Sequence, residues 1–295
     1  MKTLRRVLRS TVVAAVAAAC GSTSNGEKGV LPQGPPSGQL AALAFDIAGN
    51  RLLKAYPHAL YQSGDGGRGW EAIPVPPSVQ RGRIAAVATS PKVAGTLYIA
   101  GPGFGIMRTR DAGQTWQSLN QGLPDLTIEA FATHAELEPT LYAAIAGRGI
   151  FRTEDGGSTW RPMDRGPGSE VRQLLHSAMT GSMNTGWLYA ATPNGVHRAM
   201  DCFCGWRQAG GLPGPSEVYT VVFDPDEPAH LYASGATGVF RSRDGGESWV
   251  QLPTQGPVPL ALALDPARGV LYAATPDGVI VQSRDEGATW ERVSG

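Results

Sequence analysis

Residues Thr153–Trp160 read Thr-Glu-Asp-Gly-Gly-Ser-Thr-Trp, and the same pattern returns along the whole chain. Four near-complete copies are Ser63–Trp70, Thr109–Trp116, Ser242–Trp249 and Ser283–Trp290, and a degenerate copy is Ala199–Trp206. The Asp residues of the six copies lie 41 to 46 residues apart and are Asp65, Asp111, Asp155, Asp201, Asp244 and Asp285. The closing Trp residues are Trp70, Trp116, Trp160, Trp206, Trp249 and Trp290. A period of this length indicates one supersecondary unit repeated six times.

The repeated segment, called the box below, has the chemistry of a tight turn. Side-chain oxygens of Asp and Ser or Thr accept backbone N–H groups within a turn, and Gly adopts the positive φ that such turns need. The Trp then starts the next strand and buries a large ring beneath the turn. We therefore interpret the box as a structural feature of a hairpin.

The segments around each box predict four strands. In the fifth unit these are residues 218–223, 231–234, 239–242 and 249–252. A Leu-Tyr pair marks the second strand in five units: Leu97-Tyr98, Leu141-Tyr142, Leu188-Tyr189, Leu231-Tyr232 and Leu271-Tyr272. The pattern predicts an all-β, six-bladed β-propeller of four-stranded antiparallel blades, with the box between the third and fourth strands. Because the units are whole, we expect blades one and six to meet through side chains and loops, without a shared blade.

The box resembles the Asp-box (BNR) repeat, in the wider group of WD40/YVTN/BNR-like propellers. Six boxed blades over residues 39–295 are similar to sialidase-fold propellers and to photosystem II assembly factor (Ycf48/Hcf136-like) propellers. The resemblance implies that the boxes are structural and lie on the face opposite the working site. It identifies a fold more specifically than a function, because the shared motif is the turn itself.

The first residues predict export. Residues 1–19 hold a basic segment and the apolar run TVVAAVAAA, which together are typical of a secretory signal peptide. The stretch Val16–Cys20 resembles a bacterial lipobox, so we expect Cys20 to be lipidated; the alternative is an ordinary signal with an incidental Cys. Residues 20–38 are then the lipidated Cys and a flexible tether. We expect a lipid-anchored protein of the outer membrane or the periplasmic side of the envelope.

Composition excludes some partners. Lys plus Arg and Asp plus Glu both number 25, which argues against a nucleic-acid binder. The five His show no ligand spacing, so we expect no metal and no cofactor. Cys202 and Cys204 can form a local disulfide in an oxidising compartment, and a redox-active or metal-binding pair is the alternative. We expect a monomer whose partner is an envelope protein or a glycan.

A binding site is expected where the innermost strands begin. Aligning the units brings polar residues to one mouth of the central channel: Arg83, Glu129, Arg148, Glu170, Arg172, Glu217 and Tyr219. In one reading these charges pair with one another at a solvated opening. In the other they line a pocket for a sugar, a peptide or a partner loop.

The resemblance also sets the enzyme alternative. An exo-sialidase needs three Arg, a Tyr nucleophile with a Glu partner and an Asp acid/base. The Arg, Tyr and Glu roles can be assigned to Arg83, Arg148, Arg172, Glu217 and Tyr219, but nothing in their spacing indicates this assignment. The Phe/Tyr-Arg-Ile-Pro signature is also absent from residues 41–48. Another glycosidase would use a carboxylate pair from Glu129, Glu170 and Glu217. We therefore expect a non-catalytic binding or assembly scaffold, with a sialidase-like or other glycoside hydrolase as the alternative.

Overall fold

The computed structural model describes residues 26–32, 39–183, 185–203, 205–210, 217–253 and 258–293. They form six antiparallel sheets, each built from four consecutive strands in chain order. Blades 1 to 3 are β2 (Ala42–Asp46), β3 (Arg51–Tyr56), β4 (Ala59–Ser63), β5 (Glu71–Ile73); β6 (Ala86–Thr89), β7 (Leu97–Gly101), β8 (Gly105–Thr109), β9 (Thr115–Ser118); and β10 (Ile128–Thr133), β11 (Leu141–Ile145), β12 (Gly149–Thr153), β13 (Arg161–Asp164). Blades 4 to 6 are β14 (Gln173–Ser177), β15 (Trp187–Thr192), β16 (Gly195–Met200), β17 (Arg207–Gln208); β18 (Val218–Phe223), β19 (Leu231–Gly235), β20 (Gly238–Ser242), β21 (Val250–Gln251); and β22 (Ala261–Asp265), β23 (Val270–Ala274), β24 (Ile280–Ser283), β25 (Glu291–Arg292).

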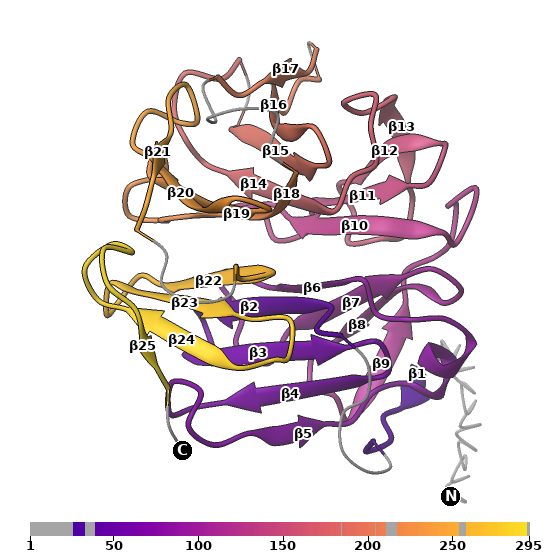
Figure 1. The fold of residues 1–295 in the computed structure, drawn as a ribbon. Helices are drawn as coiled ribbons and strands as arrows, with labels where there is room; N and C mark the ends of the chain where they lie inside the picture. The colour runs from indigo at the N-terminus through magenta and orange to yellow at the C-terminus, as the bar shows by residue number, and fades with distance from the viewer. Residues whose placement is uncertain are drawn as a thin grey trace, which may run out of the picture.

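The first strand of every blade faces the centre of the molecule (Figure 1). These inner strands contact one another in the cyclic order β2, β6, β10, β14, β18, β22, and β22 returns to β2. Within the described residues blades 1 and 6 remain separate sheets, so the ring closes without a shared blade. The prediction of a six-bladed β-propeller is confirmed. Within the same residues no helix has the length and apolar character that crossing a membrane requires.

The box of blade 3 shows how the turn is held. The hydroxyl of Thr153 accepts the N–H of Gly157 at 3.0 Å and donates to the Asp155 carboxylate at 2.7 Å. Asp155 also accepts the N–H of Thr159 at 2.8 Å and its hydroxyl at 2.6 Å. These bonds, led by that from the Thr159 hydroxyl, lower the pKa of Asp155 to about 2. Because its oxygens are occupied within its own turn, Asp155 is a structural residue.

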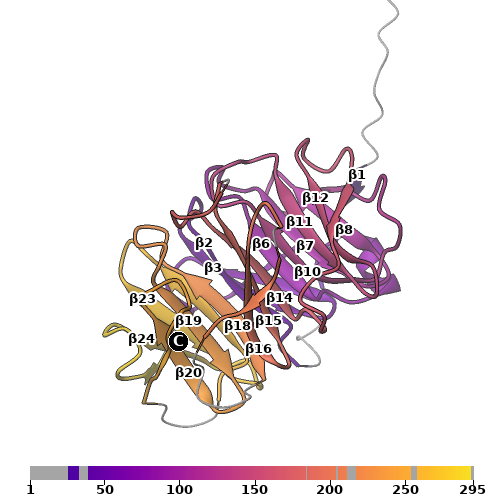
Figure 2. The same cartoon turned by 90° about the horizontal axis from the view of Figure 1, so that it is seen from above.

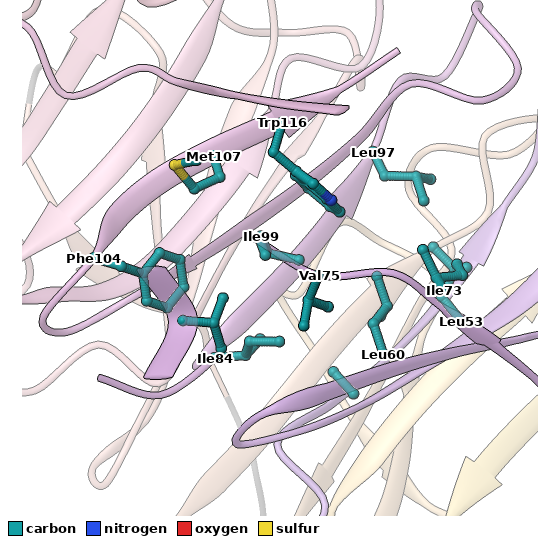
Figure 3. Packing of buried hydrophobic residues seen from close by; sticks show 12 residues of the cluster. Leu53, Leu60, Ile73, Val75, Ile84, Leu97, Ile99, Phe104, Met107 and Trp116 are labelled. Atoms are coloured by element: carbon teal, nitrogen blue, oxygen red, sulfur yellow. The ribbon is translucent and has the colours of Figure 1, made fainter. Parts of the chain in front are cut away.

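The boundary between two neighbouring blades is called a seam below, and at two seams the box Trp donates a hydrogen bond to the preceding blade. The indole N–H of Trp116 donates to the carbonyl of Pro74 in blade 1 at 2.9 Å. In the same way Trp160 donates to the carbonyl of Leu119 in blade 2 at 2.7 Å. Trp116 is fully buried and lies with Leu97, Ile99 and other apolar residues in the core between blades 1 and 2 (Figure 3).

A second link crosses the seams in the other direction. An Arg on the third strand of blades 2 to 5 binds the box turn of the next blade. Arg108, Arg152 and Arg198 donate to the carbonyls of Gly156, Asp201 and Gly245 at 3.3, 3.4 and 2.8 Å, and Arg241 pairs with Glu286 at 2.6 Å. The Tyr of each Leu-Tyr pair is buried in the same blades, and Tyr189 also donates to the carbonyl of Gly245 at 3.1 Å. The Leu-Tyr pair is therefore a seam element as well as a strand marker.

The seam between blades 1 and 2 is held differently, because Leu53 and Gln62 occupy the Tyr and Arg positions of blade 1. Here β1 (Gly26–Lys28) adds a fifth strand to blade 2 by pairing antiparallel with β9, at the periphery of the molecule (Figure 2). Val30 bridges Val75 of blade 1, and Glu27 accepts the N–H of Ser78 at 3.0 Å, in the 3-10 helix η1 (Pro77–Arg81). The expected flexible tether was therefore wrong for residues 26–30, which link blades 1 and 2.

Close packing explains why the linking segment contains a glycine. A Cβ atom on Gly29 would lie 2.0 Å from the carbonyl oxygen of Gly113, in the box of blade 2. Contacts that short do not occur, so any larger residue would displace the segment from the seam.

Blade 4 departs from the box geometry. Ala199 has no hydroxyl to hold the turn, and Asp201 is fully buried instead of exposed. Its carboxylate accepts the N–H of Thr185 at 3.1 Å, in the preceding loop. Asp201 therefore does not hold its own box turn as predicted, but binds the loop between β14 and β15 instead. Cys202 is disulfide-bonded, while Cys204 lies outside the described residues.

Two buried histidines meet Asp201 at the seam between blades 3 and 4. The rings of His134 and His176 stack with centroids 3.8 Å apart. The Nδ1 atom of His134 accepts the N–H groups of Glu136 and Leu137 at 3.0 Å, and that of His176 accepts the N–H of Ala135 at 3.1 Å. Burial lowers the pKa of both rings, more strongly than nearby Asp201 raises it. Folding therefore favours the neutral form of both rings.

Replacing Thr153 with Val tests the box turn. Valine has nearly the same shape but leaves the buried N–H of Gly157 without an acceptor, which costs about 1–3 kcal/mol. We expect the free energy of unfolding in urea to fall by that amount for Thr153→Val and much less for Thr153→Ser. Equal stability of Thr153→Val and the parent would contradict this role.

The histidine pair predicts a loss of stability in mild acid. Because both pKa values are lowered by folding, the unfolded chain binds protons first as the pH falls below about 6.5. The free energy of unfolding should then decrease by up to about 1.4 kcal/mol per pH unit for each histidine. Urea unfolding at pH 7.5 and pH 5 measures this slope. His176→Asn should reduce the slope, whereas the exposed His58→Asn should not; equal slopes in all three proteins would refute the assignment.

Candidate functional site

The central channel contains a cavity of about 310 Å³. Residues from all six inner strands line it, and most are apolar, among them Ala44, Val87, Phe131 and Leu262. Small and apolar residues are needed here because six strands converge around a narrow axis. The cavity therefore offers an apolar interior whose chemistry is set by the few polar groups at its ends.

Three predicted mouth residues come together between blades 4 and 5. Arg172 forms an ion pair with Glu217, and its guanidinium lies 5.5 Å from the ring centroid of Tyr219. The Tyr219 hydroxyl donates to Glu217 at 3.5 Å. Partial burial, followed by the charge of Glu217, raises the pKa of Tyr219. Arg172 and Tyr219 both line the cavity. Since the two charges neutralise each other, this cluster is a preformed polar rim.

A β-bulge brings Tyr219 to this rim. The register of β18 against β19 shifts between Val218 and Thr220, so Tyr219 is the extra residue of its strand. Bulges redirect a side chain and are common beside functional sites. The side-chain carbonyl of Gln173 in blade 4 accepts the N–H of Val221 at 2.6 Å and the hydroxyl of Thr220 at 2.8 Å. Gln173 was not predicted, although it stands where blades 1 to 3 have Ala42, Ala86 and Ala130.

Glu129 occupies the matching bulge of blade 3, between Ile128 and Ala130. Burial and then the charge of Glu170 raise the pKa of Glu129, against the effect of a backbone hydrogen bond at Val171. Glu129 and Glu170 are thus electrostatically coupled.

Arg83 and Arg148 do not join this cluster. Both side chains are exposed, and neither is among the described residues that line the channel cavity. The charge of Arg148 instead lowers the pKa of Asp125, after the larger effect of hydrogen bonds from Thr127. Of the three Arg that the sialidase alternative requires, only Arg172 lines the cavity.

The buried cluster of His134, His176 and Asp201 is a candidate metal centre that the sequence did not predict. Its hydrogen bonds do not fit a metal. A metal-binding His donates its second ring N–H to an acceptor. Here the Nδ1 atom of each ring accepts backbone N–H groups, so the remaining ring proton is on Nε2. Binding through Nε2 would require an imidazolate, and the cluster is better described as a structural contact of the seam.

Comparison with known proteins gives the fold an independent context. No protein-family model matches the chain, and no curated protein does. Among solved structures, it is similar to the GH74 xyloglucanase from Xanthomonas campestris, with 20% identity and a TM-score of 0.61 over 84% of this chain and 45% of that chain. It is also similar to YCF48 bound to D1 peptide, with 20% identity and a TM-score of 0.57 over 89% of this chain and 84% of that one. YCF48 from Cyanidioschyzon merolae gives 16% identity and 0.57 over 90% and 88%.

The share of each similar structure that this chain covers differs between the two groups. The chain spans between 31% and 46% of the length of three GH74 enzymes, but most of the length of the two YCF48 structures. At such low identity the similarity concerns the fold alone. The chain is therefore a six-bladed β-propeller with structural neighbours among both YCF48 and GH74 propellers.

Proposed function

We propose that this propeller is a non-catalytic binding or assembly scaffold of the bacterial cell envelope, and that it binds a polypeptide segment at the channel mouth. The observation that carries the proposal is that the polar groups at the channel mouth are already paired with one another. Arg172 and Glu217 are already paired beside Tyr219, at the end of an apolar cavity. Such a site can take an apolar side chain into the cavity and stack or hydrogen-bond the adjoining peptide at the rim.

Two further observations support binding over catalysis. Of the three arginines considered for holding a sialic acid carboxylate, only Arg172 lines the cavity, whereas Arg83 and Arg148 are exposed and do not belong to its described lining. In addition, a propeller of the same fold and similar length, YCF48, has been solved with a bound D1 peptide. A glycoside hydrolase remains the second candidate because Glu129 has a raised pKa beside Glu170, as a general acid needs.

The envelope location rests on the N-terminal sequence. Residues 1–19 and Cys20 have the pattern of a lipoprotein signal, and both lie outside the described residues. The strand β1 begins at Gly26, so a lipid on Cys20 would connect to blade 2 through a short segment. A single acyl chain gives only reversible membrane binding, so stable attachment through Cys20 requires a second acyl chain or another membrane-binding feature.

Peptide selection tests the channel mouth. A library of random peptides displayed on phage, panned against the mature protein, should yield binders rich in apolar residues. Their affinity should fall at least about tenfold in Tyr219→Ala, because contact residues of this type contribute 1.4 kcal/mol or more. The exposed Arg161→Ala on β13 is the control and should bind normally.

Two results would contradict the scaffold. The first is a selection whose binders are unaffected by Tyr219→Ala. The second is turnover of fluorogenic sialosides or glycosides that disappears in Glu217→Gln or Glu129→Gln, which would establish the hydrolase instead.

Replacing Cys20 tests the anchor. In cells expressing the full chain, we expect the protein in the membrane fraction and Cys20→Ser in the soluble fraction, because the thiol that carries the lipid is missing. Fractionation followed by immunoblotting measures the distribution. Membrane association of Cys20→Ser equal to that of the parent would exclude lipidation at this residue.

A further inference from the structure

At the seam between blades 5 and 6, two arginines share one carboxylate. Arg241 and Arg243 of blade 5 bind Glu286 of the blade 6 box at 2.6 and 2.5 Å. Glu286 follows the box residue Asp285 and has a φ of 58°. Its pKa is lowered even though burial opposes this, because both arginines favour the charged form. At this seam the carboxylate of a residue in the box turn therefore binds a pair of arginines from the preceding blade.

The seam between blades 2 and 3 has the same two arginines without the carboxylate. Arg108 and Arg110 stand in the register of Arg241 and Arg243, three residues and one residue before the box Asp. The position of Glu286 is taken by Gly156, which has the same left-handed backbone with a φ of 70°. Burial and then the charge of Arg110 lower the pKa of Arg108. Two like charges thus lie together where the other seam holds a glutamate.

A cavity of about 290 Å³ opens at this place. Its lining includes Arg108, Arg110, Gln117, Gln121, Glu138 and Gly156. Arg108 donates to Gln117 at 2.7 Å and to the carbonyl of Gly156 at 3.3 Å. Glu138 accepts the hydroxyl of Ser90 at 2.6 Å, and its charge offsets only part of the lowering of the Arg108 pKa. Asp155, also in the lining, is occupied by its own box turn.

The remaining seams have no equivalent site in the described part of the chain. Arg152 pairs with Glu154 at 2.7 Å, and Arg198 pairs with Glu247 at 2.8 Å. Blades 1 and 6 carry Gln62 and Gln282 at the first arginine position. The unpaired arrangement is therefore a local property of blades 2 and 3.

We propose that the cavity at the seam of blades 2 and 3 binds the carboxylate of an acidic residue in a partner polypeptide, in the place that Glu286 fills between blades 5 and 6. A guanidinium binds a carboxylate through charge-assisted hydrogen bonds, which are the strong ones in proteins. The volume fits a side chain with its adjoining peptide groups, and the amides of Gln117 and Gln121 and the hydroxyl of Ser158 can hydrogen-bond a main chain. This site is separate from the channel mouth, which other residues line, and does not depend on the function proposed there.

The test uses the mature chain and a blocked pentapeptide, acetyl-Gly-Ala-Glu-Ala-Gly-amide, with its Gln counterpart as the control probe. In proton–nitrogen NMR spectra, the Glu peptide should shift the amide signals of Arg110 and Gly156 and saturate in the millimolar range. The Gln peptide should not. Arg110→Met, which introduces the residue that blade 4 has at this position (Met200), should weaken binding about tenfold or more.

Two matched variants add the glutamate to one seam and remove it from the other. Gly156→Glu supplies the carboxylate from the chain itself, in a backbone conformation that Glu286 already adopts, and should abolish peptide binding. Glu286→Gly removes it from the other seam and should create a second site, seen as new shifts around Arg243. Tyr219→Ala should leave both results unchanged, which separates this site from the channel mouth.

Three outcomes would overturn the proposal. They are equal shifts with the Glu and Gln peptides, undiminished binding in both Arg110→Met and Gly156→Glu, and binding of free glutarate as tight as that of the peptide. The last would assign the cavity to a small carboxylate instead of a polypeptide.

Discussion

Contact across the seams is the constraint on which this structure depends, because within the described residues no hydrogen-bonded sheet runs from one blade to the next. The box turn supplies much of that contact. Its oxygens hold its own hairpin. The Trp of boxes 2 and 3 donates to a carbonyl of the preceding blade, and box carbonyls of blades 3, 4 and 5 accept an Arg from the preceding blade. One short segment therefore serves both the hairpin and the seam. This dual use explains why the box recurs so regularly and why its Asp residues are poor candidates for catalysis.

Departures from the repeat are more informative about function than the repeat itself. Where blade 1 lacks the seam Tyr and Arg, β1 crosses to blade 2 and restores the link. Where blade 4 lacks the box hydroxyl, Asp201 turns inward to Thr185 and the buried histidines. Both changes are compensated within the fold. The polar rim around Arg172 lines the open channel cavity. Arg108 also binds the carbonyl of Gly156 across the seam, but within the described residues no ion pair is formed by Arg108 or Arg110. These are the places where a partner can gain most from binding.

Prediction of the site from the sequence was partial for physical reasons. Arg172, Glu217 and Tyr219 were predicted to share a mouth because they stand at matching positions of adjacent inner strands, and they do meet. Arg83 and Arg148 were placed with them by the same alignment, but their side chains are exposed outside the cavity lining. Gln173 was missed because its role, binding the backbone beside a bulge of the next blade, has no signature in its own strand. The His134, His176 and Asp201 cluster was missed because its members belong to two different blades.

The sequence by itself determined the number, order and strand composition of the blades. These follow from local chemistry, since turn hydrogen bonds, positive φ at Gly and alternating burial act within a few residues and repeat with the box. Only the tertiary structure decided which charges meet. Residues about one repeat apart face each other across a seam, and a one-residue bulge redirects a side chain such as that of Tyr219. The site therefore depends on packing between blades, whereas the fold depends on the pattern within each one.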